Sequence, residues 1–279
     1  MKFRTEIAPF KGSFGISHDS RIVLLGSCFA DNIGALLHRD GFNAVYNPLG
    51  PLFNPESIAR ILERKKPYSA DDFVCFENTW HCMDVASRFR SDEPSRLASM
   101  VNSLWQPLAD ALACADVLIL TLGTTHVWRL NGTTVGNCHK LPGKLFSEHN
   151  LSVDETVSVL SRAIPRHCRT IITVSPVRYP GEGLAKGFLA KAALRVAADA
   201  LTDIVPCDYF PTYEIMNDDL RDYRFYSADM RHPSEVAVNY IYEKFCEAYF
   251  SAATVSEAQA CRRAFLREAH IPINPDHGL

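Results

Sequence analysis

The sequence lacks a long apolar run, a paired cysteine motif and an excess of positive charge. No window reaches the ~18 consecutive apolar residues that a membrane-spanning helix needs. The formal net charge is -3, from 29 basic and 32 acidic residues spread along the chain, so no basic stripe is available to neutralise a phosphate backbone. We therefore expect no membrane span and no nucleic-acid partner.

The nine cysteines are odd in number, irregularly spaced and without a Cys-x-x-Cys pair, which argues against a disulfide framework and a structural zinc site. His81 beside Cys82 and Cys138 beside His139 resemble metal ligands, but adjacent side chains rarely converge on one ion. The stretch 1–10 has no apolar region behind its positive charges, unlike a signal peptide. These features predict free thiols, no metal, no cofactor and a cytoplasmic location.

Short apolar runs alternate with segments of helical periodicity. Strands are expected at 21–25, 117–122, 170–174 and 204–205, and helices at 97–112, 153–160, 184–201 and 234–250. Fully apolar strands need cover on both faces, so this alternation predicts a three-layer α/β/α fold with a central parallel sheet. Ligands in such folds bind at the carboxyl ends of the strands.

The even composition, 47% hydrophobic over 279 residues, indicates one domain spanning 1–279. The proline-rich stretch 42–89 is interpreted as loops and short helices laid over the functional edge of the sheet. Residues 251–279 carry helical spacing and then prolines, which predicts a C-terminal helical extension.

Ser27 directly follows the first expected strand, where Gly26 permits a tight turn and a helix begins. A helix N-terminus stabilises developing negative charge, as acyl transfer requires, so Ser27 is a candidate nucleophile. A serine there is equally typical of a helix N-cap. The neighbouring Cys28 is an alternative thiol nucleophile, although successive residues in a turn point in different directions.

Asp229 and His232 lie three residues apart, immediately before the last expected helix. At this spacing a carboxylate can hold one imidazole nitrogen while the other faces outward, and a neutral imidazole with a pKa of ~6.5 can activate a hydroxyl. Taken alone, the pair is also compatible with an incidental surface loop. The chain has no G-x-S-x-G elbow, so the common α/β-hydrolase arrangement is not encoded.

Residues 26–30 spell GSCFA, and several further motifs follow in a fixed order. They are YNPLGPLFNP (46–55), LGTTHVW (122–128), NCHKLPGKLF (137–146), SPVR (175–178) and DLRDYRFYSADMRHPSEVA (219–237). Up to about residue 250 the sequence resembles the GSCFA family, which is similar to the GDSL/SGNH hydrolases. This resemblance implies an SGNH-hydrolase-like, flavodoxin-like fold.

The resemblance also implies a catalytic arrangement in which Ser27 attacks an acyl carbon and His232, oriented by Asp229, takes the serine proton. In SGNH enzymes the oxyanion is held by the amide of the nucleophile, a glycine amide and an asparagine side chain. Gly50 is the candidate glycine.

The third oxyanion donor is where the sequence departs from the SGNH pattern. Thr124 and Thr125 stand where the hydrolases would carry an asparagine and another polar residue. A threonine hydroxyl can donate one hydrogen bond, and Asn47 or Asn137 could supply an amide from another loop. Losing one donor costs on the order of 100-fold or more in rate.

Two further residues are candidates for contacting substrate. Arg178 follows the third strand, and its planar fork would suit a substrate carboxylate or phosphate, although a salt bridge to Glu182 or Asp208 explains it equally well. His139 is expected either to line the pocket or to secure a loop.

The sequence therefore predicts an esterase or O-acyl transfer enzyme that forms an acyl-Ser27 intermediate on a small-molecule ester. An acylated saccharide is the suggested substrate by fold-level analogy alone. The alternative is a binding protein that keeps the scaffold without turnover, motivated by the threonines at the asparagine position. A phosphodiesterase is a weaker third option, because it would call for a divalent metal.

Overall fold

The computed structural model describes residues 5–179, 181 and 183–268, and its centre is a five-stranded parallel sheet of order β11-β10-β6-β1-β2. The strands are β1 (Arg21–Gly26), β2 (Asn43–Tyr46), β6 (Val117–Leu122), β10 (Arg169–Val174) and β11 (Cys207–Tyr209). The chain adds β2 on one side of β1 and then adds the other three strands on the opposite side. This is the doubly wound order, whose winding reverses between β1 and β6, the place where such folds bind ligands.

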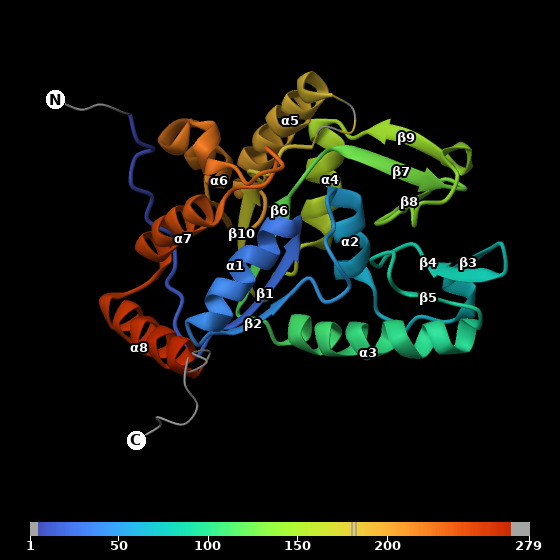
Figure 1. Ribbon diagram of the computed structural model, residues 1–279, viewed down its shortest axis with the longest axis horizontal. Coiled ribbons are helices and arrows are strands. Elements are labelled where there is room, and N and C mark those ends of the chain that lie inside the picture. Colours follow the sequence, from blue (N-terminus) through green and yellow to red (C-terminus); the bar gives the residue numbers. More distant parts are fainter. Residues whose placement is uncertain (1–4, 180, 182, 269–279) are drawn as a thin grey trace, which may run out of the picture.

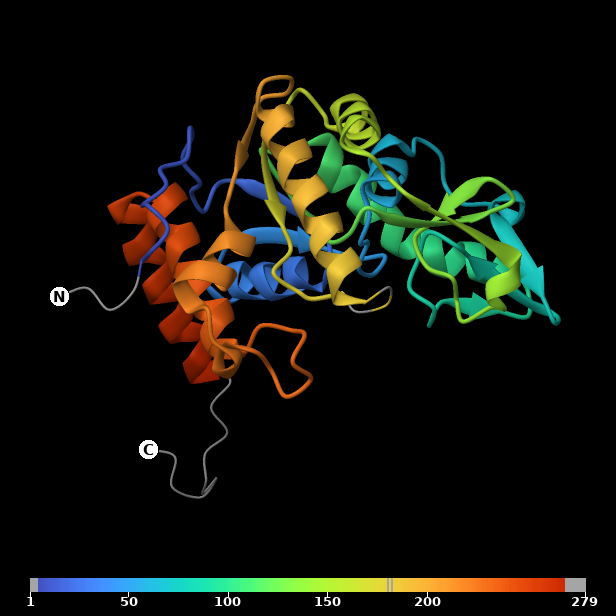
Figure 2. The same ribbon diagram turned by 90° about the horizontal axis from the view of Figure 1, so that it is seen from above.

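Helices cover both faces of the sheet, as Figures 1 and 2 show. One face carries α1 (Cys28–Arg39), α7 (Glu235–Tyr249) and α8 (Ala252–Glu268), and the other carries α2 (Pro55–Glu63), α3 (Pro94–Ala113), α4 (Val153–Ala163) and α5 (Leu184–Thr202). Alternate strand residues divide between the layers, so that Leu24 packs with α1 and α7 whereas Leu25 packs with the second layer. The prediction of a three-layer α/β/α fold with a central parallel sheet is confirmed.

Two small antiparallel sheets lie at the end of the molecule away from α7 and α8 (Figure 1). One comprises β3 (Phe73–Phe76), β4 (Thr79–Cys82) and β5 (Arg90–Ser91), and the other β7 (His126–Leu130), β8 (Thr133–Val135) and β9 (Phe146–Asn150). Short elements complete the chain: η1 (Ala70–Asp72), η2 (Gly143–Leu145), α6 (Thr212–Glu214), the π-helical η3 (Ile215–Leu220) and η4 (Tyr223–Phe225).

The expectation of only loops and short helices in 42–89 is wrong, because β2, β3 and β4 lie there. These strands are four residues long and only partly buried, so they show no run of apolar residues that would predict them. β3 and β4 form a hairpin around Glu77 and Asn78, which adopt positive φ angles of 47° and 61°, as its two-residue turn requires.

The fourth expected strand is misplaced by a few residues. The amides of Ile204 and Val205 donate to the carbonyl oxygen of Leu201, so 204–205 form a turn at the end of α5 and the strand begins at Cys207. Two hydrophobic residues after a helix are equally compatible with such a turn. The C-terminal helical extension is present as α8, and the rest of it, 269–279, lies outside the described residues.

Candidate active site

Ser27 lies at the point where the winding of the sheet reverses. β1 ends at Gly26, whose φ of +140° and close approach to β6 leave no room for a side chain: an added Cβ would lie 2.2 Å from the carbonyl oxygen of Thr121. The Ser27 Oγ then accepts a hydrogen bond of 3.3 Å from the Phe29 amide. The N-cap interpretation is therefore correct, and it leaves the hydroxyl at the ligand-binding edge of the fold.

The Ser27 hydroxyl also contacts a second serine that the sequence analysis did not single out as a site residue. Its Oγ lies 2.9 Å from the Oγ of Ser175, which follows β10 and in turn accepts a hydrogen bond of 3.2 Å from the Val177 amide. Both serines are buried, with 1% and 0% of their surface exposed. The sequence signal for Ser175 is that it directly follows a buried strand, whereas its contact with Ser27 depends on the order of the strands in the sheet.

Asp229 and His232 form the pair that their spacing predicts. The His232 Nδ1 lies 2.5 Å from the Asp229 Oδ2, and the Asp229 Oδ1 accepts hydrogen bonds of 3.0 Å from the amides of Arg231 and His232. These backbone and side-chain hydrogen bonds from His232, with the Arg231 amide, hold the pKa of Asp229 well below its ordinary value. Among the described residues the Nε2 of His232 has no hydrogen-bond partner, so it is available to a substrate or nucleophile.

One backbone hydrogen bond fixes the segment 221–234, which carries this pair, to the edge of the sheet where Ser27 lies. The Arg178 amide donates to the Arg231 carbonyl oxygen at 3.0 Å, three residues beyond Ser175. Within the described part of the chain, however, no hydrogen bond joins Ser27 to His232, whose side chain is 44% exposed. The structure brings both to one edge, and the complete triad stays a prediction.

Both backbone amides expected to hold an oxyanion already donate to carbonyl oxygens of the protein. The Ser27 amide donates to the Thr121 carbonyl oxygen at 2.9 Å, and the Gly50 amide donates to the Asn47 carbonyl oxygen at 2.8 Å. The Thr124 hydroxyl accepts from the His126 amide at 3.1 Å. These donors and their neighbours shape the turn around Ser27, and their role toward an oxyanion stays a prediction.

Asn47 clamps the turn between β1 and α1. Its Oδ1 accepts a hydrogen bond of 2.9 Å from the Gly26 amide, while its Nδ2 donates to the Ser27 carbonyl oxygen at 3.3 Å. Both ends of the amide are thus engaged beside the candidate nucleophile. Thr125, directly before β7, is buried, and its carbonyl oxygen accepts from the Leu151 amide at 2.9 Å.

Asn137 and His139 are held against β4. The Asn137 Oδ1 accepts from the His139 amide at 2.8 Å, and the His139 Nε2 lies 2.8 Å from the Cys82 carbonyl oxygen. Burial lowers the pKa of His139 to about 4, so the ring is neutral near pH 7. The structure favours a role for His139 in holding its loop in place, because it forms hydrogen bonds with Asn137 of the same loop and with Cys82 of β4.

Cys28 does not have the features of an activated thiol. Burial, and then the nearby carboxylate of Asp31, raise the pKa of the Cys28 thiol above its ordinary value. A reactive cysteine needs a lowered pKa. This difference favours Ser27 over Cys28 as the nucleophile.

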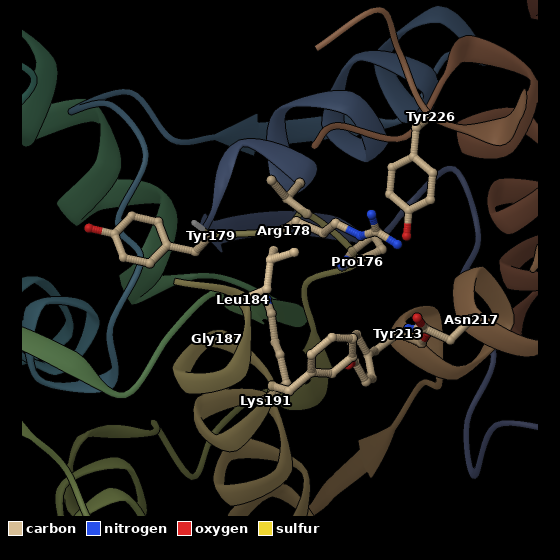
Figure 3. A pocket seen from close by; sticks show the side chains of 11 residues that line it. Pro176, Arg178, Tyr179, Leu184, Gly187, Lys191, Tyr213, Asn217 and Tyr226 are labelled. Carbon is tan, nitrogen blue, oxygen red and sulfur yellow. The ribbon is translucent and has the colours of Figure 1, made fainter. Parts of the chain in front are cut away.

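A pocket opens directly beyond Ser175 (Figure 3). The Arg178 guanidinium lies over the rings of Tyr223 and Tyr226, with its carbon 4.8 and 4.2 Å from their centroids. Asp208, one of the two acids considered for a salt bridge, instead accepts from the Ser13 amide. The other, Glu182, lies outside the described residues.

Lys191 lines the same pocket and was missed by the sequence analysis. Its side chain comes from α5, is 5% exposed and donates from Nζ to the Ser175 carbonyl oxygen at 2.7 Å. Burial lowers the pKa of Lys191 to about 7. Its position in the buried face of α5, between Gly187 and Leu194, was the signal that could have revealed it.

A family model matches the part of the chain that carries Ser27 and His232. The model of the GSCFA family matches residues 21–245, from β1 into α7. The chain belongs to the GSCFA family. The match includes Ser27, Ser175, Lys191 and the Asp229–His232 pair, whereas a search of the curated proteins and of the solved structures gives no match.

Two classes of feature are absent from the part of this GSCFA chain that the structure describes. No helix there is long and apolar enough to cross a lipid bilayer. In 5–179, 181 and 183–268, no group of three His, Cys, Asp or Glu side chains is placed to hold a metal ion. All nine cysteines lie in this part and are free thiols.

Proposed function

We propose that this GSCFA protein is a serine esterase or O-acyl transfer enzyme that works through an acyl-Ser27 intermediate. The observation that carries the proposal is the placement of an oriented imidazole and a strand-end serine at one edge of the sheet. His232 is oriented by Asp229 at 2.5 Å, and the Arg178–Arg231 hydrogen bond holds its segment to the strand end that carries Ser175, the partner of Ser27.

In the proposed reaction the Ser27 Oγ forms a bond to the acyl carbon of an ester while His232 Nε2 takes the hydroxyl proton. The tetrahedral intermediate then breaks the bond to the leaving oxygen, which receives that proton from His232. Water completes hydrolysis of the acyl-serine, and a second hydroxyl completes transfer. The substrate is a small ester, with an acetylated saccharide suggested by fold-level analogy.

Two adjustments accompany substrate binding in this mechanism. The segment 221–234 moves His232 to within ~3 Å of Ser27, the reach that proton transfer needs. The Ser27 hydroxyl leaves Ser175 and turns toward the acyl carbon. The positive end of α1, a 12-residue helix, then faces the developing oxyanion.

Covalent labelling with a fluorophosphonate probe tests the nucleophile. We expect the wild type to be labelled, Ser27→Ala to lose labelling, and Ser158→Ala, a change of an exposed serine on α4, to be labelled like the wild type. Loss of the helix cap in Ser27→Ala costs about 1 kcal/mol, so its melting temperature is measured alongside. Equal labelling of wild type and a folded Ser27→Ala would overturn the proposal.

A second candidate function, a ligand-binding protein without turnover, is favoured by one observation. The Ser27 amide and the Gly50 amide both donate to carbonyl oxygens within the protein. A screen of p-nitrophenyl esters separates the two functions. Turnover that disappears in His232→Ala rejects the binding protein, whereas no turnover together with saturable ligand binding rejects the enzyme.

A further inference from the structure

The pocket beyond Ser175 contains two cationic side chains and no carboxylate to neutralise them among its described lining residues. Its walls are formed by the segment after β10, the first turns of α5, and residues of α6, η3 and the segment 221–234. Arg178 and Lys191 are the only charged side chains among the described residues that line it.

Arg178 is held in place by aromatic rings instead of by an acid. Its guanidinium lies over Tyr223 and Tyr226, and Figure 3 shows it beside the hydroxyl of Tyr226. No ion pair to Arg178 occurs among the described residues. An arginine fixed on aromatic faces keeps its planar set of donors available for an oxyanion.

Lys191 is the stronger observation, because a lysine inside a protein is costly unless something offsets its charge. Its side chain is 95% buried, and its one hydrogen bond is to the neutral carbonyl oxygen of Ser175. No carboxylate lies within ion-pair distance in the described part of the chain. The Lys191 ammonium group has three N–H donors and uses one of them on Ser175, the partner of Ser27, so the others can bind a ligand.

The rim of the pocket is apolar. Leu184 and Phe188, on the first turns of α5, line the pocket and are still 52% and 55% exposed. Large side chains with that exposure, placed around a cavity, indicate contact with an apolar part of a ligand.

We propose that this pocket binds the substrate through an oxyanion, a carboxylate or phosphate, that Arg178 and Lys191 hold, while an apolar group of the same molecule lies on Leu184 and Phe188. Calling this ligand a substrate rests on the proposed function, whereas the binding of an anion in the pocket does not. In the bound substrate, the anionic group would lie in this pocket and the ester would lie at Ser27.

The charge of Lys191 gives this subsite a pH dependence. The groups facing it are Cys28 of α1, Tyr213 of α6 and Arg178, and burial raises the pKa values of the Cys28 thiol and the Tyr213 hydroxyl, which favours their neutral forms. The pKa of Lys191 itself is about 7. Anion affinity should therefore fall as pH rises above that value.

Binding of hexanoate, hexyl phosphate, inorganic phosphate and the neutral hexanol to the full chain, measured by calorimetry, tests the proposal. We expect the two amphipathic anions to bind at least about 10-fold more tightly than hexanol, since charge-assisted hydrogen bonds contribute about that much. If hexanoate binds more tightly than hexyl phosphate, the anionic group of the ligand is a carboxylate. If hexyl phosphate binds more tightly, the group is a phosphate. Hexanol binding as tightly as both anions would overturn the proposal.

Variants locate the subsite. Arg178→Gln and Lys191→Met should each weaken hexanoate binding about 10-fold or more, whereas Arg224→Gln, an arginine of the same segment that does not line the pocket, should not. Raising the pH from 7.5 to 9 should weaken binding to the wild type about 10-fold and leave Lys191→Met unaffected. Unchanged affinity in a folded Arg178→Gln contradicts the proposal even if Lys191→Met fails to fold.

The two proposals can fail separately. Hexanoate binding is measured in Ser27→Ala as well as in the wild type, so it does not depend on a reactive serine. Anion binding without fluorophosphonate labelling would leave the subsite and reject the esterase. Fluorophosphonate labelling without anion binding would leave the esterase proposal and reject the subsite.

Discussion

Lys191 also makes a quantitative prediction about stability that requires no knowledge of the substrate. In the folded protein its pKa is about 7, whereas the ordinary value, which applies to the unfolded chain, is 10.5. Between these values the unfolded state binds one more proton than the folded state. The free energy of unfolding therefore rises with pH in the window from about 7 to 10.5, because the folded state escapes the cost of a buried charge.

The size of this effect follows from the two pKa values. Each unit of pH at which the proton difference is complete changes the free energy of unfolding by about 1.4 kcal/mol. Lys191 is half protonated in the folded state at pH 7. The free energy of unfolding therefore increases by about 2 kcal/mol between pH 7 and 9, and by only about 0.4 kcal/mol between pH 5 and 7. Lys191→Met lacks this titration and should lack this gain.

Urea unfolding of the wild type and Lys191→Met at pH 5, 7 and 9, under reducing conditions, measures the difference. Other titrating groups, including the buried cysteines and tyrosines, contribute to both proteins and cancel when the two are subtracted. Lys144→Met, at an exposed position in η2, serves as the matched control and should follow the wild type. Parallel pH profiles for the wild type and Lys191→Met would refute the reasoning.

Three further outcomes are expected. Gly26→Ala should lower the free energy of unfolding by roughly 3 kcal/mol or more in urea titrations, because its Cβ would meet a backbone oxygen of β6 at 2.2 Å. Asp40→Asn should cost about 3 kcal/mol and expose α8 to limited proteolysis, since this fully buried carboxylate pairs with Arg262 of α8. Ser175→Ala should lower the free energy of unfolding by about 2 kcal/mol in urea titrations, because the buried Ser27 hydroxyl and the Val177 amide both lose their acceptor; an unchanged free energy of unfolding would contradict this reasoning.

The main body of the fold was predictable from hydrophobic patterning. Apart from an exposed arginine at the start of β1 and β10, the strands β1, β6 and β10 are buried throughout, so each is a run of mostly apolar residues. The edge strand β2 and the short β3 and β4 lie partly in contact with solvent and have no such run. Their pairing depends on neighbours that are known only once the chain is folded.

Part of the candidate site was predictable, because some of its residues stand in recognisable local sequence patterns. Ser27 and the Asp229–His232 pair stood out because a local pattern accompanies each of them. Ser175 is adjacent to Ser27 only because β10 and β1 both pair with β6, a relation that the linear sequence does not contain. The engagement of the Ser27 and Gly50 amides likewise follows from backbone geometry and could not be inferred from residue types.

Lys191 shows where local pattern and function diverge. The buried face of α5 includes Lys191, Leu194, Ala198 and Leu201, positions three or four residues apart that a helix places on one side. A leucine at 191 would pack without the cost of desolvating a charge. A lysine there lowers stability near neutral pH, so its presence needs a compensating role. The two observations that offer one are its hydrogen bond to Ser175, the partner of Ser27, and its place in a pocket that Arg178 shares. Lys191 brings a cost in stability to a buried helix position whose side chain contacts Ser175, the partner of the candidate nucleophile. An anion-binding active site predicts such a cost, and a purely structural α5 does not.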